Sequence, residues 1–136
     1  MYSYLERNRF YIIHLPLFLY WIVLFVLTSL PGNVSLDLNV SDKIEHFGAY
    51  GLLSFLLYLT LVFQKKYPFF ANYPATFTLL FASFYGMVDE LHQLFVPGRS
   101  ADVRDWLADF LGSLLAVLIA KFILVKLKQM ELKKFN

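Results

Sequence analysis

Residues 85–109, YGMVDELHQLFVPGRSADVRDWLAD, place charged side chains where two hydrophobic segments of the chain meet. Asp89 and Glu90 lie near the end of the first segment, and a Pro97-Gly98 turn follows before the second segment begins. A charged side chain at the centre of a bilayer costs about 2.5–3.5 kcal/mol on insertion scales. Charges at such a position have to be paired, hydrated or metal-bound. This stretch is therefore the predicted functional end of the molecule.

The composition indicates an integral membrane protein. Of the 136 residues, 59% are hydrophobic, and the mean hydropathy of +0.58 is too high for an ordinary soluble domain. The absence of cysteine excludes disulfides, cysteine-ligated metal sites and a cysteine nucleophile. No basic run alternates with aromatic residues, so nucleic acid is not a predicted partner despite the net charge of +2.

Four hydrophobic segments are predicted to form membrane-spanning helices, at about residues 10–30, 44–63, 75–95 and 106–125. Each is long enough to cross a hydrocarbon core of about 30 Å at about 1.5 Å per residue. We therefore expect one transmembrane domain over residues 1–136, an all-α integral membrane four-helix bundle. A cleaved signal peptide is the competing interpretation of the first segment. It is disfavoured because the apolar run is too long and lacks a small-x-small cleavage site.

The distribution of charge predicts the orientation. Nine Lys and Arg residues belong to the termini and the loop around Lys65, against three in the other two loops. The positive-inside rule then places both termini in the cytoplasm. The lysine-rich C-terminal tail is expected to contact the headgroups of anionic membrane lipids. The acidic residues predicted on the outer side are Asp37, Asp42, Glu45, Asp89, Glu90, Asp102, Asp105 and Asp109.

Polar residues recur at helical spacing in three of the four predicted helices. The second helix has Asp42, His46 and Tyr50 on one face, with Gly48 and Gly51 expected to allow close helix approach. The corresponding stripes are Gly86, Asp89, Glu90 and Gln93 in the third helix, and Asp102, Asp105, Asp109, Gly112 and Ala116 in the fourth, with the first two aspartates expected before the helix proper. We expect the three stripes to meet at the outer ends of the helices.

Each polar feature also has a purely structural interpretation. Arg99 can pair with Glu90 or Asp102 and lock the third and fourth helices together, instead of contacting a ligand. Ser41 or Asp42 can cap the second helix, which needs no function. A histidine that faces the core of a bundle is more often a hydrogen-bonded structural residue than a ligand.

The chemistry that this set permits is limited. There is no P-loop and no dinucleotide fingerprint. Carboxylates with a histidine fit a divalent metal, and a neighbouring arginine fits a phosphoryl oxygen. The candidates for metal ligation or acid–base catalysis are Asp42, His46, Glu90 and Asp105. Three classes stay open: a ligand-binding protein, a metal-dependent hydrolase or transferase acting on a lipid-linked phosphate, and a structural protein whose polar groups only lock helices. Whether the protein is an enzyme is not decided by the residues.

Three stretches resemble the VanZ-like family of bacterial membrane proteins. They are DKIEHFGAYGLLSFLL from residue 42, YGMVDELHQLFVPGRSADVRD from residue 85 and WLADFLGS from residue 106. The residues that match the family's polar positions are Asp42, His46, Tyr50, Glu90, Gln93, Arg99 and Asp105. One departure is Asp109, where the family usually has asparagine, which adds a negative charge.

The resemblance implies a multi-pass protein of the bacterial plasma membrane, and it is compatible with the outer site that the charge distribution predicts. The family is named after a protein associated with low-level teicoplanin resistance. The implied ligand is therefore an anionic lipid or a cell-wall-related molecule, and glycopeptide susceptibility is the implied phenotype. Ligand-binding candidates are Arg99, Gln93, Tyr50 and Asp109. A divalent metal is a possible cofactor, and neither the ligand nor the oligomeric state follows from the residues.

Overall fold

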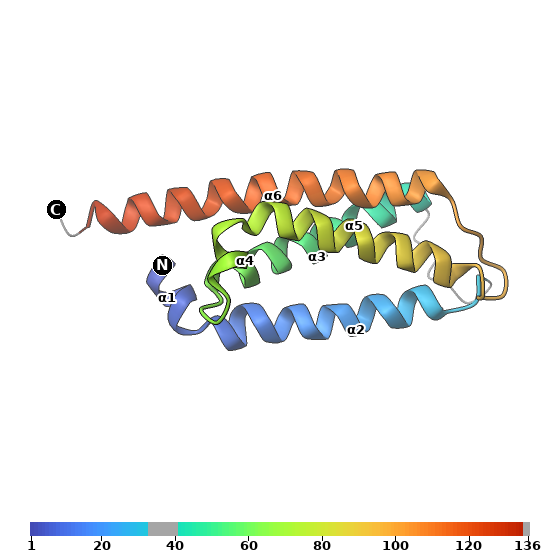
Figure 1. Ribbon diagram of the computed structural model, residues 1–136, viewed down its shortest axis with the longest axis horizontal. Helices are drawn as coiled ribbons and strands as arrows, with labels where there is room; N and C mark the ends of the chain where they lie inside the picture. The colour runs from blue at the N-terminus through green and yellow to red at the C-terminus, as the bar shows by residue number, and fades with distance from the viewer. Residues whose placement is uncertain (33–40, 135–136) are drawn as a thin grey trace.

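Every regular element in the described part of the chain is a helix. The computed structural model describes residues 1–32 and 41–134. In chain order the elements are α1 Tyr2–Arg7, the π-helix η1 Phe10–His14, α2 Leu15–Ser29, α3 Asp42–Phe63, α4 Pro68–Asn72, α5 Pro74–Gln93 and α6 Val103–Leu132 (Figure 1). The predicted all-α membrane helical bundle is confirmed. Asp37, predicted on the outer side, lies outside the described residues.

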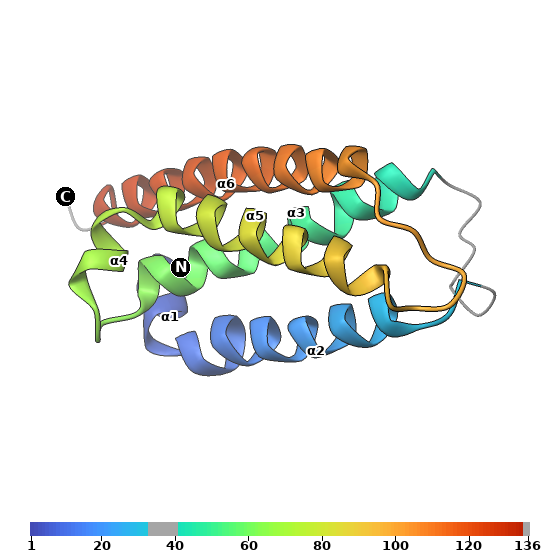
Figure 2. The same cartoon turned by 45° about the vertical axis from the view of Figure 1, so that its right-hand side comes forward.

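Four long helical segments lie side by side and correspond to the four predicted hydrophobic segments (Figures 1 and 2). Three of them, Phe10–Ser29, Asp42–Phe63 and Val103–Leu132, are long and apolar enough to cross a membrane, with mean hydropathies of 2.3, 1.6 and 2.2. The fourth, α5, has 20 residues but is not among the three, and polar side chains such as Glu90 occupy its last turns. It packs against α3 and α6. A fourth crossing by α5 stays a prediction.

The first long segment changes its winding next to Pro16. In η1 the N–H of Leu15 bonds the carbonyl of Phe10, five residues back instead of four. Proline has no N–H and displaces the carbonyl four residues before it, so a wider turn beside it relieves the clash. The π-helix continues directly into α2, and the two elements form the single segment that the first hydrophobic run predicts.

The last helix is longer than the hydrophobic pattern predicts, because α6 continues seven residues past Val125 to Leu132. The added residues are Lys, Leu, Lys, Gln, Met, Glu and Leu, all good helix formers, without Gly or Pro. Glu131 near its end lies 2.8 Å from the amino group of Met1, which ties α1 to α6. The helix therefore extends beyond the end of the hydrophobic segment.

The closest packing of the bundle is between α3 and α6. A Cβ on Gly112 would collide with the carbonyl oxygen of Phe47, and a Cβ on Gly51 would lie 3.5 Å from the carbonyl oxygen of Gly112. Small residues let helix backbones approach closely in a membrane. The prediction for Gly51 is confirmed. The prediction for Gly48 is wrong, because a Cβ there would meet nothing within 4 Å.

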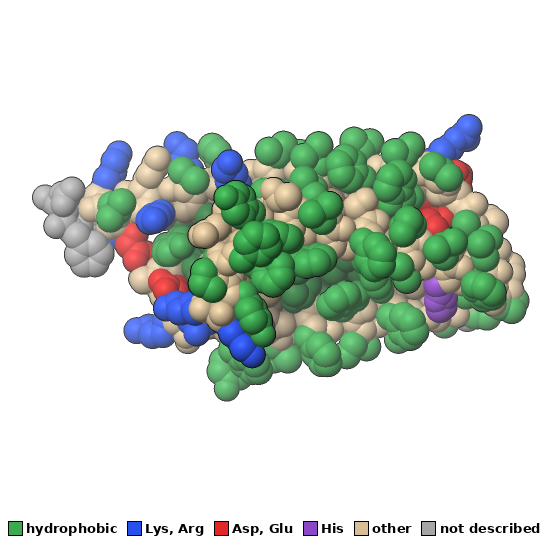
Figure 3. All heavy atoms as spheres, in the orientation of Figure 1, with side chains coloured by type: hydrophobic (Ala, Val, Ile, Leu, Met, Phe, Trp, Pro, Cys, Tyr) green, Lys and Arg blue, Asp and Glu red, His purple; other side chains and the backbone are tan. Residues whose placement is uncertain are grey.

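The two ends of the bundle differ in chemistry. Both termini lie at one end, where most of the visible Lys and Arg side chains also gather (Figures 1 and 3). The buried core nearer this end is apolar: Ile13, Tyr58, Leu59, Phe63, Val117, Ala120 and Leu124. The opposite end, called the loop end here, contains the end of α2, the start of α3, the end of α5 and the start of α6 (Figure 1). Most of the buried side chains there are polar.

Candidate functional site at the loop end

Three helices bring polar side chains together at the loop end. The set comprises Asp42, Lys43, His46 and Tyr50 from α3, Asp89, Glu90 and Gln93 from α5, and Asp102, Asp105 and Asp109 from α6 and its N-cap. We call these ten residues the polar cluster. Seven of them are at most 8% exposed. The structure therefore brings together all three stripes that the helical spacing singles out.

His46 lies at the centre of the polar cluster. Its Nδ1 is 3.0 Å from Asp109 Oδ1 and 3.9 Å from Glu90 Oε1, and its Nε2 is 4.0 Å from Asp42 Oδ1. Its ring also stacks parallel to Tyr50, with 6.4 Å between ring centroids. One imidazole thus faces three carboxylates from three helices. Such a group is stabilised by a protonated imidazole, by a protonated carboxyl group or by a bound cation.

Gly86 of α5 gives the Asp109 carboxylate its space. A Cβ on Gly86 would lie 2.8 Å from Asp109 Oδ2 and 3.3 Å from Tyr50 Cε1. A larger residue would displace the carboxylate or the tyrosine ring. Because Gly86 has no side chain, there is room for Asp109, which is 0% exposed.

Lys43 and Asp102 connect the rim of the polar cluster. The Lys43 ammonium lies 3.3 Å from Asp102 Oδ2 and 3.0 Å from Asp105 Oδ1. Asp102 caps α6, because its side chain accepts the Arg104 N–H at 2.8 Å, while its own N–H donates to Glu90 Oε2 at 2.7 Å. The Arg104 hydrogen bond lowers the pKa of the Asp102 carboxyl, and Lys43 lowers it further. The predicted place of Asp102 before the helix is confirmed. The same prediction for Asp105 is wrong, because α6 begins at Val103 and Asp105 lies in its first turn.

Arg99 does not form the predicted ion pair. Among the described residues its guanidinium pairs with neither Glu90 nor Asp102, and its Nε donates instead to the Leu30 carbonyl at 3.5 Å. Lys43 pairs instead with Asp102, one of the two partners that the sequence suggested for Arg99, and with Asp105. The tight turn before Arg99 is confirmed, because Gly98 has φ +76° and the Arg99 N–H bonds the Val96 carbonyl at 3.1 Å.

The predicted side-chain cap of α3 is also absent. Ser41 is the N-cap residue, but no side chain accepts a hydrogen bond in the cap position there. Asp42 and Glu45 lie in the first turn, where acidic groups favour the helix N-terminus electrostatically. Asp42 is therefore not committed to capping. Its carboxylate is mostly exposed and faces His46.

Several buried polar atoms of this region are unsatisfied. Tyr50 Oη, Ser54 Oγ, Glu90 Oε1 and Asp109 Oδ2 have no hydrogen-bond partner within the described ranges. Leaving a buried polar group without a partner costs about 1–3 kcal/mol. Gln93 Nε2 reaches Asp89 Oδ2 only at 3.5 Å, the limit for a hydrogen bond. Three of the four unsatisfied atoms belong to the polar cluster, which therefore retains capacity to bind.

Two groups in the described part of the chain have metal-ligand geometry. In the first group His46, Glu90 and Asp109 are all buried. In the second group His46 and Asp105 are buried and Asp42 is exposed. In each group the ligand atoms lie within 4.8 Å of one another. Of the four residues predicted as metal ligands, Asp42 and Asp105 belong to one group, Glu90 belongs to the other, and His46 belongs to both. Asp109, which was predicted to bind a ligand, completes the buried group.

Sequence reasoning did not place Lys43 in the site. It stands one residue off the stripe of Asp42 and His46, yet its long side chain reaches both Asp102 and Asp105. The available signal was a single cation at the start of a helix among residues that are otherwise acidic. Arg99, in contrast, lies at the loop end but outside the polar cluster.

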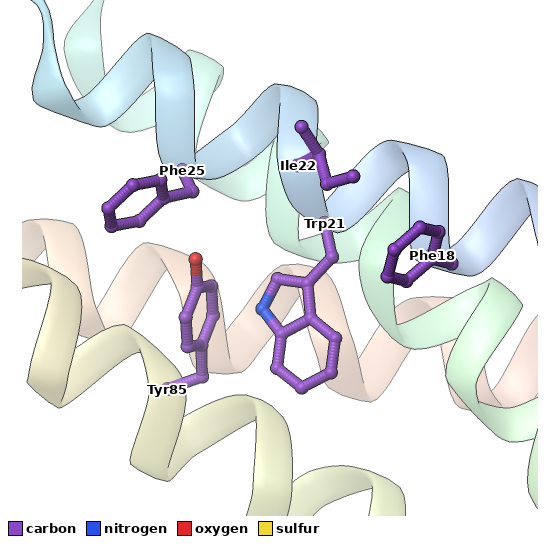
Figure 4. A pocket seen from close by; sticks show the side chains of 5 residues that line it. All are labelled: Phe18, Trp21, Ile22, Phe25 and Tyr85. Atoms are coloured by element: carbon purple, nitrogen blue, oxygen red, sulfur yellow. The ribbon is translucent and has the colours of Figure 1, made fainter.

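An apolar groove of about 320 Å³ opens between α2 and α5. Its lining consists of Phe18, Trp21, Ile22, Phe25 and Tyr85 (Figure 4). The Trp21 and Tyr85 rings meet edge to face, with 5.5 Å between centroids. The Tyr85 ring lies 6.0 Å from the ring of Tyr50, which belongs to the polar cluster. The groove therefore adjoins the cluster through one pair of tyrosines.

Fold and site together define a helical membrane protein with a buried polar centre near one end. A family model described as VanZ/LLP1 matches residues 7–125, and the chain belongs to this family. The matched range includes the whole polar cluster. Comparison with curated proteins gives no match, and comparison with solved structures gives none either. The family resemblance read from the three stretches is confirmed.

Proposed function

We propose that this VanZ-family protein binds a phosphate-bearing lipid, such as a lipid-linked cell-wall intermediate, at the outer leaflet of the bacterial plasma membrane. Through that ligand it influences susceptibility to glycopeptides such as teicoplanin. The observation that carries the proposal is the polar cluster, in which buried carboxylates and His46 converge at one end of an otherwise apolar bundle. Buried ionisable residues in a membrane protein are costly and mark functional sites.

The outer location follows from the charge distribution. Nine of the twelve Lys and Arg residues lie in the half of the bundle that contains both termini, opposite the polar cluster (Figures 1 and 3). The positive-inside rule assigns that end to the cytoplasm. The polar cluster then faces the leaflet where cell-wall intermediates are used and where glycopeptides act.

The side chains at the loop end suit a ligand with both phosphate and hydroxyl or amide groups. Lys43, Arg99 and Arg104 are the basic residues there, and each is at least partly exposed. Arginine and lysine bind phosphate oxygens through charge-assisted hydrogen bonds. The Tyr50 hydroxyl, which has no hydrogen-bond partner among the described residues, suits a hydroxyl or amide group of the ligand.

The groove between α2 and α5 supports a lipid rather than a soluble ligand. Its lining residues lie in the hydrophobic part of the bundle, and Phe18, Trp21 and Phe25 are exposed on the surface of the bundle. In a membrane this surface contacts the hydrocarbon chains of lipids. A lipid whose headgroup lies at the polar cluster places one chain along this groove, past Tyr85 and Tyr50.

The experiment is to identify the lipids that copurify with the protein by native mass spectrometry. We expect wild type to retain a phosphate-bearing lipid, His46→Ala to lose it, and Trp21→Ala to retain less of it. Glu45→Gln is the matched control, because Glu45 lies one residue before His46 and makes no side-chain hydrogen bond or ion pair within the described ranges. Equal retention in His46→Ala and Glu45→Gln contradicts the proposal.

The link to glycopeptides has its own test. Cells that express wild type or Glu90→Gln are compared for the lowest teicoplanin concentration that stops growth. We expect wild type to change this concentration and Glu90→Gln to leave it at the level of the empty vector. If wild type and variant have the same effect, the polar cluster is not the origin of the phenotype.

A metal-dependent hydrolase or transferase acting on a lipid-linked phosphate is the second candidate. It is favoured by the contact of His46 with Asp109 and Glu90, since an imidazole beside carboxylates can serve acid–base catalysis with a metal. Release of phosphate from a lipid pyrophosphate by wild type with divalent metal, lost in Glu90→Gln, supports this candidate. If no ligand binds and no phosphate is released, the polar cluster only locks the helices.

A further inference from the structure

We infer that His46, Glu90 and Asp109 form a binding site for one first-row divalent metal ion, such as Zn²⁺ or Mn²⁺. This inference rests on the proposed function for its purpose, because it supplies the positive centre that a phosphate needs in a cluster of carboxylates. The three residues come from α3, α5 and α6 and are all buried. A metal would therefore join three helices at one point.

The distances are close to those of a metal site. His46 Nδ1 lies 3.0 Å from Asp109 Oδ1 and 3.9 Å from Glu90 Oε1. A Zn²⁺ ion with bonds of about 2.0–2.2 Å holds its donor atoms roughly 3–3.5 Å apart. Every pair of donor atoms in this group lies within 4.8 Å, so binding needs shifts of at most about 1–2 Å, which side-chain rotation provides.

Two unsatisfied oxygens point to a ligand independently of the acidic composition. Glu90 Oε1 and Asp109 Oδ2 are buried and accept no hydrogen bond from any described residue. The side chains of Glu90 and Asp109 are only 9% and 1% exposed. A metal held by His46 Nδ1, Glu90 Oε1 and both carboxylate oxygens of Asp109 satisfies both atoms at once. A protonated His46 has a single N–H at Nδ1, which lies 3.0 Å from Asp109 Oδ1 and 3.9 Å from Glu90 Oε1, and it satisfies neither of them.

The surrounding contacts hold the ligands in orientation. Glu90 Oε2 accepts the Asp102 N–H at 2.7 Å, which leaves Oε1 directed toward His46. Asp42 Oδ1 lies 4.0 Å from His46 Nε2, on the side of the ring away from Asp109. Metal-binding histidines commonly give their second N–H to a carboxylate, and ligating carboxylates are themselves hydrogen-bonded. Asp102 supplies the second support through its N–H, and Asp42 is the carboxylate nearest to Nε2, although 4.0 Å is longer than a hydrogen bond.

The other possible group, Asp42 with His46 and Asp105, fits less well. The Asp105 carboxylate is already neutralised by Lys43 at 3.0 Å, and the Asp42 side chain is 57% exposed. The group around Asp109 has no lysine or arginine partner among the described residues. Its donor set of one imidazole and two carboxylates suits Zn²⁺ or Mn²⁺ better than Mg²⁺ or Ca²⁺, which prefer oxygen ligands alone.

The test measures metal binding by the purified full-length protein in detergent, without added lipid. Elemental analysis after dialysis against Zn²⁺ or Mn²⁺ is expected to give one ion per chain for wild type. We expect Glu90→Gln and Asp109→Asn to bind at least about tenfold more weakly, since each removes an anionic ligand. Glu45→Gln is the matched control, because Glu45 lies one residue before His46 and makes no side-chain hydrogen bond or ion pair within the described ranges.

X-ray absorption spectroscopy of metal-loaded wild type keeps the inference testable if a variant fails to fold. One imidazole among oxygen ligands is expected. A spectrum without imidazole, binding that is unchanged in both variants, or no binding at all overturns the inference. Lipid retention is then measured with and without EDTA. If EDTA does not change lipid retention, the proposed function stands, but the metal does not bind the phosphate of the lipid. If the protein binds metal and retains no lipid, only the proposed function is contradicted.

Discussion

His46 Nδ1 on α3 and Asp109 Oδ1 on α6 lie 3.0 Å apart, and both side chains are buried. One turn farther along α6, Gly112 brings the two backbones into contact. The polar pair and the glycine contact therefore secure the same helix interface, the former through charge and the latter through van der Waals packing.

A double-mutant cycle measures the strength of the polar pair. Removing one partner of a buried charged pair leaves the other unsatisfied, so His46→Ala and Asp109→Ala are each expected to lower the unfolding free energy by about 3 kcal/mol. The double variant should lose less than the sum, by about 0.5–3 kcal/mol. Unfolding in mixed detergent micelles followed by circular dichroism gives these values, and strictly additive losses would show that the pair does not interact.

Gly112→Ala is expected to destabilise the bundle although alanine is the better helix former. Its Cβ meets the Phe47 carbonyl oxygen, which is backbone and cannot rotate away, so the helices have to separate. Gly48→Ala is the matched control on α3, where a Cβ meets nothing within 4 Å and the gain in helix propensity is about 1 kcal/mol. The melting temperature should fall for Gly112→Ala and stay level or rise for Gly48→Ala. The reverse order contradicts the packing described for α3 and α6.

Arg99→Ala separates ligand contact from structural support. The single hydrogen bond from Arg99 to the Leu30 carbonyl is long, at 3.5 Å, so its loss is expected to change the unfolding free energy by less than about 1 kcal/mol. If Arg99 binds the phosphate of a ligand, lipid retention falls while stability holds. Lipid retention and stability are also measured for Arg104→Ala, which removes another basic residue of the loop end at the exposed start of α6. A large loss of stability in Arg99→Ala would assign the residue to the structure instead.

The cap of α6 predicts a dependence on pH. The pKa of Asp102 is lowered in the folded protein, so its contribution is present above the pKa of the unfolded chain and is lost as the pH falls through the folded value. Wild type should melt at a higher temperature than Asp102→Asn at pH 7, and the difference should shrink on acidification below the ordinary carboxyl range. A difference that grows at low pH contradicts this assignment.

Helical spacing predicted the polar end well because it depends only on local geometry. Residues four apart share a face whatever the tertiary structure, so Asp42, His46 and Tyr50 were aligned before any contact was known. The buried position of Asp109 followed in the same way. Spacing does not predict which face of a helix packs against which neighbouring helix. For this reason Gly48 was assigned to a helix interface that it does not reach.

The ion pairs were harder to predict, because they depend on side-chain length and loop geometry. Lys43 stands off the polar stripe but reaches Asp102 and Asp105, whereas Arg99 follows a turn that directs it toward Leu30. The extent of α6 escaped the pattern for another reason, since hydrophobicity marks a membrane span and helix propensity continues beyond it.

The most direct test of ligand binding at the polar cluster is the thermal stability of purified wild type beside Glu90→Gln and Glu45→Gln. Each is measured in detergent with EDTA, Mg²⁺, Mn²⁺ or Zn²⁺, and with a panel of anionic lipids. A ligand at 100 times its Kd adds about 2.7 kcal/mol to the folded state. We predict that metal with a phosphate-bearing lipid raises the Tm of wild type and Glu45→Gln, and that Glu90→Gln folds but does not respond. No rise with any addition, or an equal rise in all three proteins, would contradict a binding site at His46, Glu90 and Asp109.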